Sequence, residues 1–236
     1  MDAPPAPAAA RTEEADTPAG PARISWYAAT RPRSVLALGH GAGGGIEARD
    51  LAALAAVLPA AGVVVALVEQ PWRVAGRRLA PAPATLDAGW TVLWPALASP
   101  GLPVIAGGRS AGARVACRTA ERLGAAAVLA LAFPLHPPGR PGSSRAAELT
   151  AAADILPLLT VQGGHDPFGR PAEFPPGREP VEVPYADHGF GVPKRAGVTQ
   201  EEALAVLTGA VADWLADLGH ATAHAGGRTG SRSGHR

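Results

Sequence analysis

The chain has 236 residues and a formal net charge of +1, with 47% hydrophobic and 17% charged residues. Its length fits one or two domains, and its apolar content is sufficient for a buried core. A charge balance this close to neutral argues against a broad basic face, so we expect no nucleic-acid partner.

The two ends of the chain differ in composition from its middle. Residues 1–21 are rich in Ala and Pro, and residues 220–236 are rich in Gly, Ser, Arg and His. Neither segment can bury enough apolar surface to offset the entropy lost on ordering. We therefore predict two disordered tails that flank a single domain at residues 22–219.

Several features favour a cytoplasmic protein without a membrane partner. The N-terminus lacks a charged segment followed by an apolar run, as a signal peptide would have. The apolar stretches are too short to span a membrane and are broken by Pro or Gly. Cys117 is the single cysteine, so no intramolecular disulfide can form, and we expect a packed thiol.

Short apolar runs alternate with segments of helical pattern along the middle of the chain. The runs are continuous, which is typical of strands buried on both faces of a parallel sheet. In chain order the predicted strands are Ile24–Tyr27, Ser34–Leu38, Gly62–Val68, Leu102–Ala106, Ala127–Ala132, Leu156–Val161 and Pro180–Val183. The predicted helices are Glu47–Leu58, Ala84–Leu97, Ala111–Leu123 and Thr199–Leu218. This order predicts an α/β fold with a doubly wound, mostly parallel sheet of about six to eight strands and helices on both faces.

Three arginines recur along one predicted helix. Arg114, Arg118 and Arg122 are spaced four residues apart, which places them on one helix face. We predict that this face is solvated.

A nucleophile motif lies between a predicted strand and a predicted helix. It reads Gly108-Arg109-Ser110-Ala111-Gly112. In a G-x-S-x-G elbow the Ser occupies a strained turn, and small flanking residues let backbone segments cross closely. The pentapeptide alone is also consistent with a glycine-rich turn that carries an incidental serine. Its strand–turn–helix context favours Ser110 as a nucleophile.

A serine nucleophile needs a general base, and the base needs an acid that orients it, in the chain order Ser, acid, His. Asp166 lies just past a predicted strand, and His188 precedes the final predicted helix. We predict His188 as the base and Asp166 as the acid. Asp187 is the competing acid, but neighbours on a loop rarely join side chain to side chain. His165 and His136 are the competing bases.

The glycine-rich segment Gly39–Gly45 follows another predicted strand. In this interpretation its backbone supplies one oxyanion-hole amide, from Ala42 or Gly43, and Ala111 supplies the second.

The same segment supports an alternative from another class. Gly39, Gly41 and Gly44 match the dinucleotide fingerprint, and Glu69 ends the following strand, where an acid could meet a ribose hydroxyl. An NAD(P)-binding oxidoreductase would use these residues. The fingerprint is common by chance in a chain with 29 Gly, and it leaves the Ser–Asp–His order unexplained. A strand is also predicted ahead of it, whereas the fingerprint usually lies in the first βαβ unit.

We predict no metal site and no cofactor. The histidines are scattered, and the sequence contains neither a Cys-x-x-Cys pair nor a P-loop.

Six motifs occur in order: LGHGAGGG, EQPWRVAGRR, GGRSAGAR, FPLHPPGRP, VQGGHDPFG and DHGF. Together they resemble the dienelactone-hydrolase-like branch of the α/β-hydrolase superfamily. Within it, the likeness is to the group that includes testis-expressed protein 30 and the non-specific lethal complex subunit 3. The resemblance covers Ser34 to Leu218. It implies a triad of Ser110, Asp166 and His188, a core without a large cap domain, and cleavage of small esters, lactones or thioesters.

Other residues are candidates for binding such a small-molecule substrate. Arg109 and Arg73 could receive a substrate carboxylate, although both could equally brace loops. Trp72, Phe133 and His136 are predicted to line the substrate pocket. The remaining alternative is a catalytically silent binding or scaffold protein on a hydrolase fold. The sequence makes no prediction of oligomeric state.

Overall fold

The computed structural model describes residues 9–226, with side chains described as far as His220. One eight-stranded sheet forms its centre, in the order β1-β2-β4-β3-β5-β6-β7-β8. β1 pairs antiparallel with β2, and β2 antiparallel with β4; the other neighbours are parallel. The strands are β1 (Arg11–Thr17), β2 (Gly20–Tyr27), β3 (Ser34–Gly39), β4 (Val63–Glu69), β5 (Val104–Arg109), β6 (Ala127–Leu131), β7 (Leu158–Gly163) and β8 (Val181–Val183).

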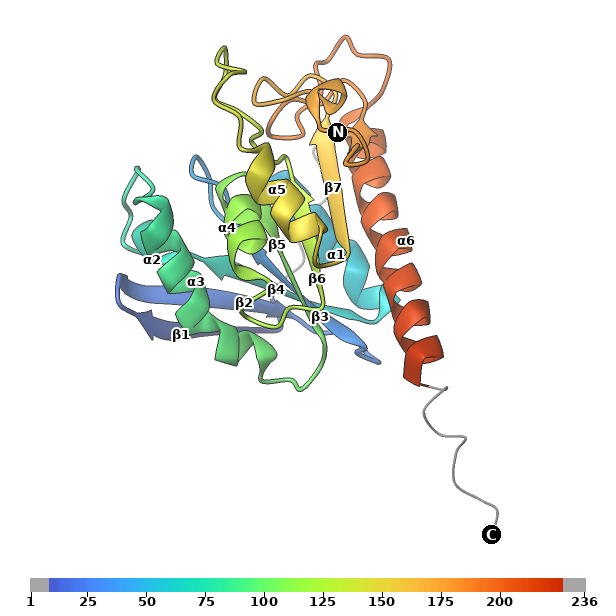
Figure 1. Ribbon diagram of the computed structural model, residues 1–236. Helices are drawn as coiled ribbons and strands as arrows, with labels where there is room; N and C mark the ends of the chain where they lie inside the picture. The colour runs from blue at the N-terminus through green and yellow to red at the C-terminus, as the bar shows by residue number, and fades with distance from the viewer. Residues whose placement is uncertain (1–8, 227–236) are drawn as a thin grey trace.

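Helices cover both faces of this sheet (Figure 1). The α-helices are α1 (Arg49–Val57), α2 (Pro71–Val74), α3 (Pro83–Ala98), α4 (Ala111–Thr119), α5 (Ala146–Ala153) and α6 (Gln200–Gly226), with 3-10 turns at Leu58–Ala61 and Pro171–Glu173. Two apolar clusters separate the layers. One joins the sheet to α1 and α6, and the other joins it to α2, α3, α4 and α5. The predicted doubly wound α/β fold is therefore confirmed.

A large cap domain is absent from the described residues, as expected. The chain passes from the end of β6 to α5 through residues 132–145, which form only a short loop. None of the helices described between residues 9 and 226 has the length and apolar content of a membrane span.

The predicted tails are wrong in part. Residues from Arg11 onward form β1 and the start of β2, because a polar edge strand gains its order from backbone pairing with its neighbour rather than from burial. The guanidinium of Arg11 also lies 5.2 Å from the ring centroid of Trp26. At the other end, α6 continues to Gly226, past the boundary predicted at residue 219. Residues 1–8 and 227–236 lie outside the described part of the chain.

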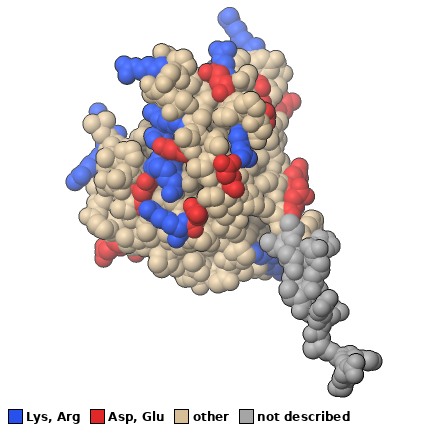
Figure 2. Space-filling model, viewed as in Figure 1, with Lys and Arg blue, Asp and Glu red and all other residues tan. Residues whose placement is uncertain are grey.

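The predicted solvated arginine face is confirmed only for Arg122, which is exposed just past the end of α4, whereas Arg114 and Arg118 are ion-paired. Arg114 donates two hydrogen bonds to Glu148 of α5, and Arg118 bridges Glu148 and Asp87 of α3. Figure 2 shows cationic and anionic side chains interleaved over these helices. The face was misjudged because its acidic partners come from helices distant in sequence. Arg114 and Arg118 thus join α4 to α5 and α3.

Candidate active site

Ser110 occupies a strained turn between β5 and α4. Its backbone angles are φ 54° and ψ −109°, a region that residues with a side chain rarely adopt. The turn fits because glycines stand where three backbone segments cross. A Cβ at Gly108 would lie 2.6 Å from the carbonyl oxygen of Gly39, and a Cβ at Gly112 would collide with that same oxygen.

We expect Gly112→Ala to lower the free energy of unfolding by about 1–3 kcal/mol, because the added methyl overpacks a crossing of rigid backbones. Urea unfolding measures this change. Gly209→Ala is the matched control, since a Cβ there meets nothing within 4 Å and α6 should gain stability. Equal stability of Gly112→Ala and wild type would contradict this account of the elbow.

His188 joins Ser110 to Asp166. Its Nε2 lies 2.9 Å from the Ser110 Oγ, and its Nδ1 lies 2.7 Å from the Asp166 Oδ2. The Asp166 side chain is fully buried, and the His188 side chain is 18% exposed. An imidazole placed in this way can accept the hydroxyl proton at Nε2 while the carboxylate fixes its tautomer.

Two residues that the sequence analysis missed hold this arrangement. Gln162 Nε2 donates to the Asp166 Oδ2 at 2.8 Å, and the Phe168 amide donates to its Oδ1 at 2.8 Å. The Phe168 ring stacks on the His188 imidazole, with centroids 4.1 Å apart. Gln162 could have been identified from the sequence, because it is a polar residue at the end of an apolar run. Phe168 carried no such signal.

Asp187, the competing acid, faces its own loop. Its Oδ1 accepts hydrogen bonds from the amides of Gly189 and Gly191, both at 2.8 Å. His165, one competing base, packs edge-on against Tyr185. Both residues therefore shape loops near His188 instead of contacting Ser110.

Arg109 braces the His188 loop, which is the second of the two roles considered for it from the sequence. Its Nη2 donates to the His188 carbonyl oxygen at 2.8 Å, and its Nε lies 3.4 Å from the Asp50 Oδ2. The Asp50 carboxyl is fully buried at the start of α1. Burial raises its pKa above the ordinary value, and the Arg109 guanidinium opposes this shift. The buried pair thus connects α1, the elbow and the loop that carries His188.

The glycine-rich loop after β3 passes directly beside Ser110. A Cβ at Gly41 would lie 3.3 Å from the Ser110 Cβ. Ala111 begins α4, so its amide has no acceptor within that helix. The amides predicted to form an oxyanion hole, those of Ala42, Gly43 and Ala111, therefore belong to segments that flank the Ser110 side chain.

The comparisons with known proteins agree with the fold. The profile of the alpha/beta hydrolase domain family matches residues 32–216. The chain belongs to the α/β hydrolase family. A search of curated proteins finds no match.

Several solved structures share this fold. A serine hydrolase without a lid, XC6422 from Xanthomonas campestris, aligns over 90% of this chain and 98% of its own, at 18% identity and a TM-score of 0.63. The dienelactone hydrolase of Anabaena variabilis aligns over 88% and 96%, at 18% identity and a TM-score of 0.65. Est1E from Butyrivibrio proteoclasticus aligns over 87% and 99%, at 14% identity and a TM-score of 0.58.

In this α/β hydrolase, His40 fixes the glycine-rich loop to the end of β4. The backbone N–H of Gln70 can only donate, so His40 Nε2 accepts its hydrogen bond at 3.0 Å. The proton therefore lies on Nδ1, which donates to the Gly41 carbonyl oxygen at 2.8 Å. Burial lowers the pKa of His40 below its ordinary value, so the imidazole remains neutral.

The lowered pKa of His40 predicts a loss of stability in acid. As the pH falls below about 6.5, the unfolded chain takes up a proton at this position while the folded chain does not, which favours unfolding. We expect wild type to lose more stability between pH 7.5 and pH 5.5 than His40→Asn does. Urea unfolding at both pH values measures the difference. Identical pH dependence in the two proteins would contradict the neutral His40.

The remaining residues predicted to bind substrate are mostly engaged elsewhere. Trp72 is buried against the His40 ring, and Phe133 is fully buried in the core. His136 is buried and hydrogen-bonded at both nitrogens, to the Pro137 carbonyl and to Glu173. The Pro137 carbonyl, followed by Glu173, raises the pKa of His136. The sequence gives no sign of whether the core or the site takes such side chains at strand ends, so a role for these three residues in substrate binding stays a prediction. Arg73 remains near the glycine loop, paired with Glu47.

The structure does not favour the dinucleotide alternative. The Glu69 carboxylate, which would have to meet a ribose, is only 15% exposed and is ion-paired with Arg23 at 2.9 Å. Among the residues described, no cluster of His, Cys, Asp and Glu is suited to hold a metal ion.

Proposed function

We propose that this α/β hydrolase is a serine hydrolase that cleaves a small ester, lactone or thioester through an acyl-enzyme on Ser110. The observation that carries the proposal is the continuous series of hydrogen bonds from Ser110 through His188 to the buried Asp166. The lidless and esterase-like structural neighbours support the same class of reaction. The proposal places the protein in the dienelactone-hydrolase-like branch, near the testis-expressed protein 30 group, and in the cytoplasm.

The first half of the reaction forms the acyl-enzyme. The Ser110 Oγ attacks the substrate carbonyl carbon and gives its proton to His188 Nε2, while Asp166 stabilises the imidazolium. The amides of Ala111 and of Ala42 or Gly43 stabilise the negative oxygen of the tetrahedral intermediate. On collapse, the bond to the leaving oxygen or sulfur breaks, and His188 returns the proton to that leaving group.

The second half releases the acid. Water gives a proton to His188 and attacks the acyl carbon, and collapse of the second tetrahedral intermediate restores the Ser110 hydroxyl. Every proton transfer uses residues of this chain, so the proposed reaction requires neither a metal nor a cofactor.

Labelling with a fluorophosphonate probe tests the proposal. We expect wild type and Ser143→Ala to react, because Ser143 is an exposed loop residue outside the Ser110–His188–Asp166 series, and we expect Ser110→Ala not to react. Equal labelling of wild type and Ser110→Ala would exclude Ser110 as the nucleophile. Absence of both labelling and turnover across a panel of small esters and thioesters would favour the scaffold alternative.

A further inference from the structure

A cavity lies at the amino-terminal ends of the parallel strands, on the far side of the sheet from Ser110. It has a volume of about 320 Å³ and is lined by residues at the amino ends of β3, β4 and β5 and by the second half of α6. Because β5 runs its whole length between Pro103, at this cavity, and Ser110, the two sites are separated by the body of the sheet. The cavity is therefore distinct from the proposed active site.

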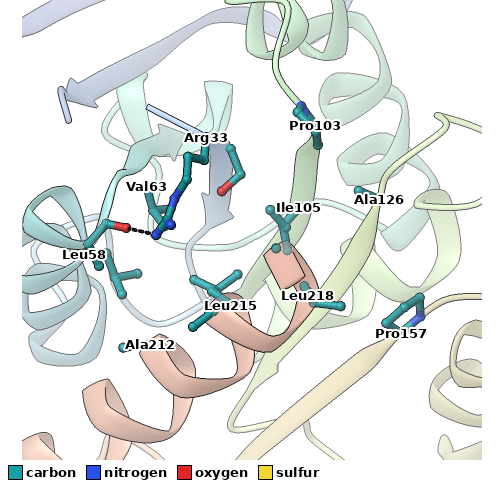
Figure 3. Close-up of a pocket in the computed structure, with 14 residues that line it drawn as sticks. Arg33, Leu58, Val63, Pro103, Ile105, Ala126, Pro157, Ala212, Leu215 and Leu218 are labelled. Carbon is teal, nitrogen blue, oxygen red and sulfur yellow. Dashed lines mark hydrogen bonds between the residues drawn. The ribbon is translucent and has the colours of Figure 1, made fainter. Parts of the chain in front are cut away.

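The walls of this cavity are apolar. Leu58, Ile105 and Leu215 are buried side chains that face it from three elements (Figure 3). Ala126 and Ala212 are also among its lining residues, and their small side chains leave the space unfilled. An unfilled apolar space costs stability because the surrounding side chains lack packing partners. An apolar group of a ligand would supply those partners.

A cationic group stands at the rim of the same space. Arg33 projects beside Leu58 and Val63, and its Nη2 donates to the Ala61 carbonyl oxygen at 2.7 Å (Figure 3). No Asp or Glu is among the described residues that line the cavity, and Arg33 forms no ion pair within the described chain. The site thus combines an apolar interior with one uncompensated positive charge.

We propose that this cavity binds an amphipathic monocarboxylate, with its alkyl chain between α6 and the sheet and its carboxylate at Arg33. The cavity volume lies at the lower end of the range for small-molecule sites, about 300–1,000 Å³. A ligand with an alkyl chain of medium length fits this volume. The guanidinium selects a carboxylate over a neutral amphiphile of the same length. Such a ligand binds across α6 and the strand ends, so it stabilises the folded protein.

Titration calorimetry with octanoate tests the site, in wild type and in Ser110→Ala. We expect saturable binding with the same Kd in both proteins and a rise in Tm with octanoate concentration. Ala212→Phe fills the cavity and should weaken binding at least about tenfold. Ala205→Phe is the matched control, because Ala205 is exposed on the same helix and does not line the cavity.

Recognition of the ligand's carboxylate is tested separately from binding of its alkyl chain. We expect Arg33→Gln to weaken octanoate binding by about fivefold, as fits an exposed charge pair, and to leave the binding of octan-1-ol unchanged. Arg31→Gln removes the same charge from the same loop, outside the cavity, and should change neither. Since Arg33 is exposed, its substitution should not affect folding.

Four results would overturn the proposal. Absence of saturable octanoate binding would refute it, and so would undiminished binding by a folded Ala212→Phe protein. An equal loss of octanoate and octan-1-ol affinity in Arg33→Gln would refute recognition of the carboxylate. Self-association that Ala212→Phe abolishes and octanoate does not affect would instead assign the cavity to a contact between two copies of this chain.

Discussion

Replacement of His188 by Ala is expected to lower kcat/KM for a small activated ester by about 10⁴-fold or more. The imidazole accepts the Ser110 proton, and no other base contacts that hydroxyl within the described residues. The side chain is partly exposed and packs on Phe168, so the free energy of unfolding should fall by only about 1–2 kcal/mol. Hydrolysis of p-nitrophenyl acetate and urea unfolding measure the two effects.

Two comparisons separate this role from a general loss of structure. His165→Ala removes an exposed histidine from a neighbouring loop and should retain nearly full activity. The double variant Ser110→Ala, His188→Ala should be no slower than either single variant, because nucleophile and base act as one unit. A loss below tenfold in His188→Ala would refute general-base catalysis by this residue.

The second large effect concerns stability. Arg109→Met should lower the free energy of unfolding by about 3–5 kcal/mol, because it leaves the fully buried Asp50 without a counter-charge. The double variant Asp50→Asn, Arg109→Met should recover part of this loss. Activity should also fall, since the His188 carbonyl loses its donor. Arg73→Met removes an exposed ion pair with Glu47 and should cost less than about 1 kcal/mol.

The Arg109→Met variant should also acquire a distinctive pH dependence. Burial raises the pKa of Asp50 in the folded protein, and loss of the guanidinium raises it further. The folded state then holds a proton that the unfolded state has released. Stability should therefore decline as the pH rises from about 3.8 through the folded pKa, more steeply than in wild type. Parallel stability profiles in the two proteins would show that Arg109 does not compensate the Asp50 charge.

The central sheet was predictable because its strands are buried on both faces. Continuous apolar runs such as those of β3 and β4 have few other interpretations in a chain of this length. β1 was missed because its sequence, RTEEADT, is polar and its order comes from pairing with β2. Pairing between strands leaves no trace in the composition of a single edge strand.

The proposed triad was predictable for a different reason. In parallel sheets, residues that directly follow different strands lie together at the carboxyl ends of those strands. Chain order alone therefore brings Ser110, Asp166 and His188 into a common region. The supporting contacts were not predictable in the same way. Asp50 lies within a predicted helix whose pattern does not distinguish a buried carboxylate from an exposed one. The sequence likewise does not indicate that the Arg109 side chain points toward Asp50 and the His188 carbonyl.

The antiparallel strand β1 has a consequence for the behaviour of shortened chains. β2 carries the buried side chains Ile24 and Trp26, and β1 covers its outer edge with a strand rich in charged residues. A chain cut just before Gly20 would expose the amides and carbonyls of β2 beside apolar side chains, which is a template for pairing between molecules. Such a chain should form aggregates detectable by light scattering, whereas removal of residues 1–8 leaves the protective edge in place.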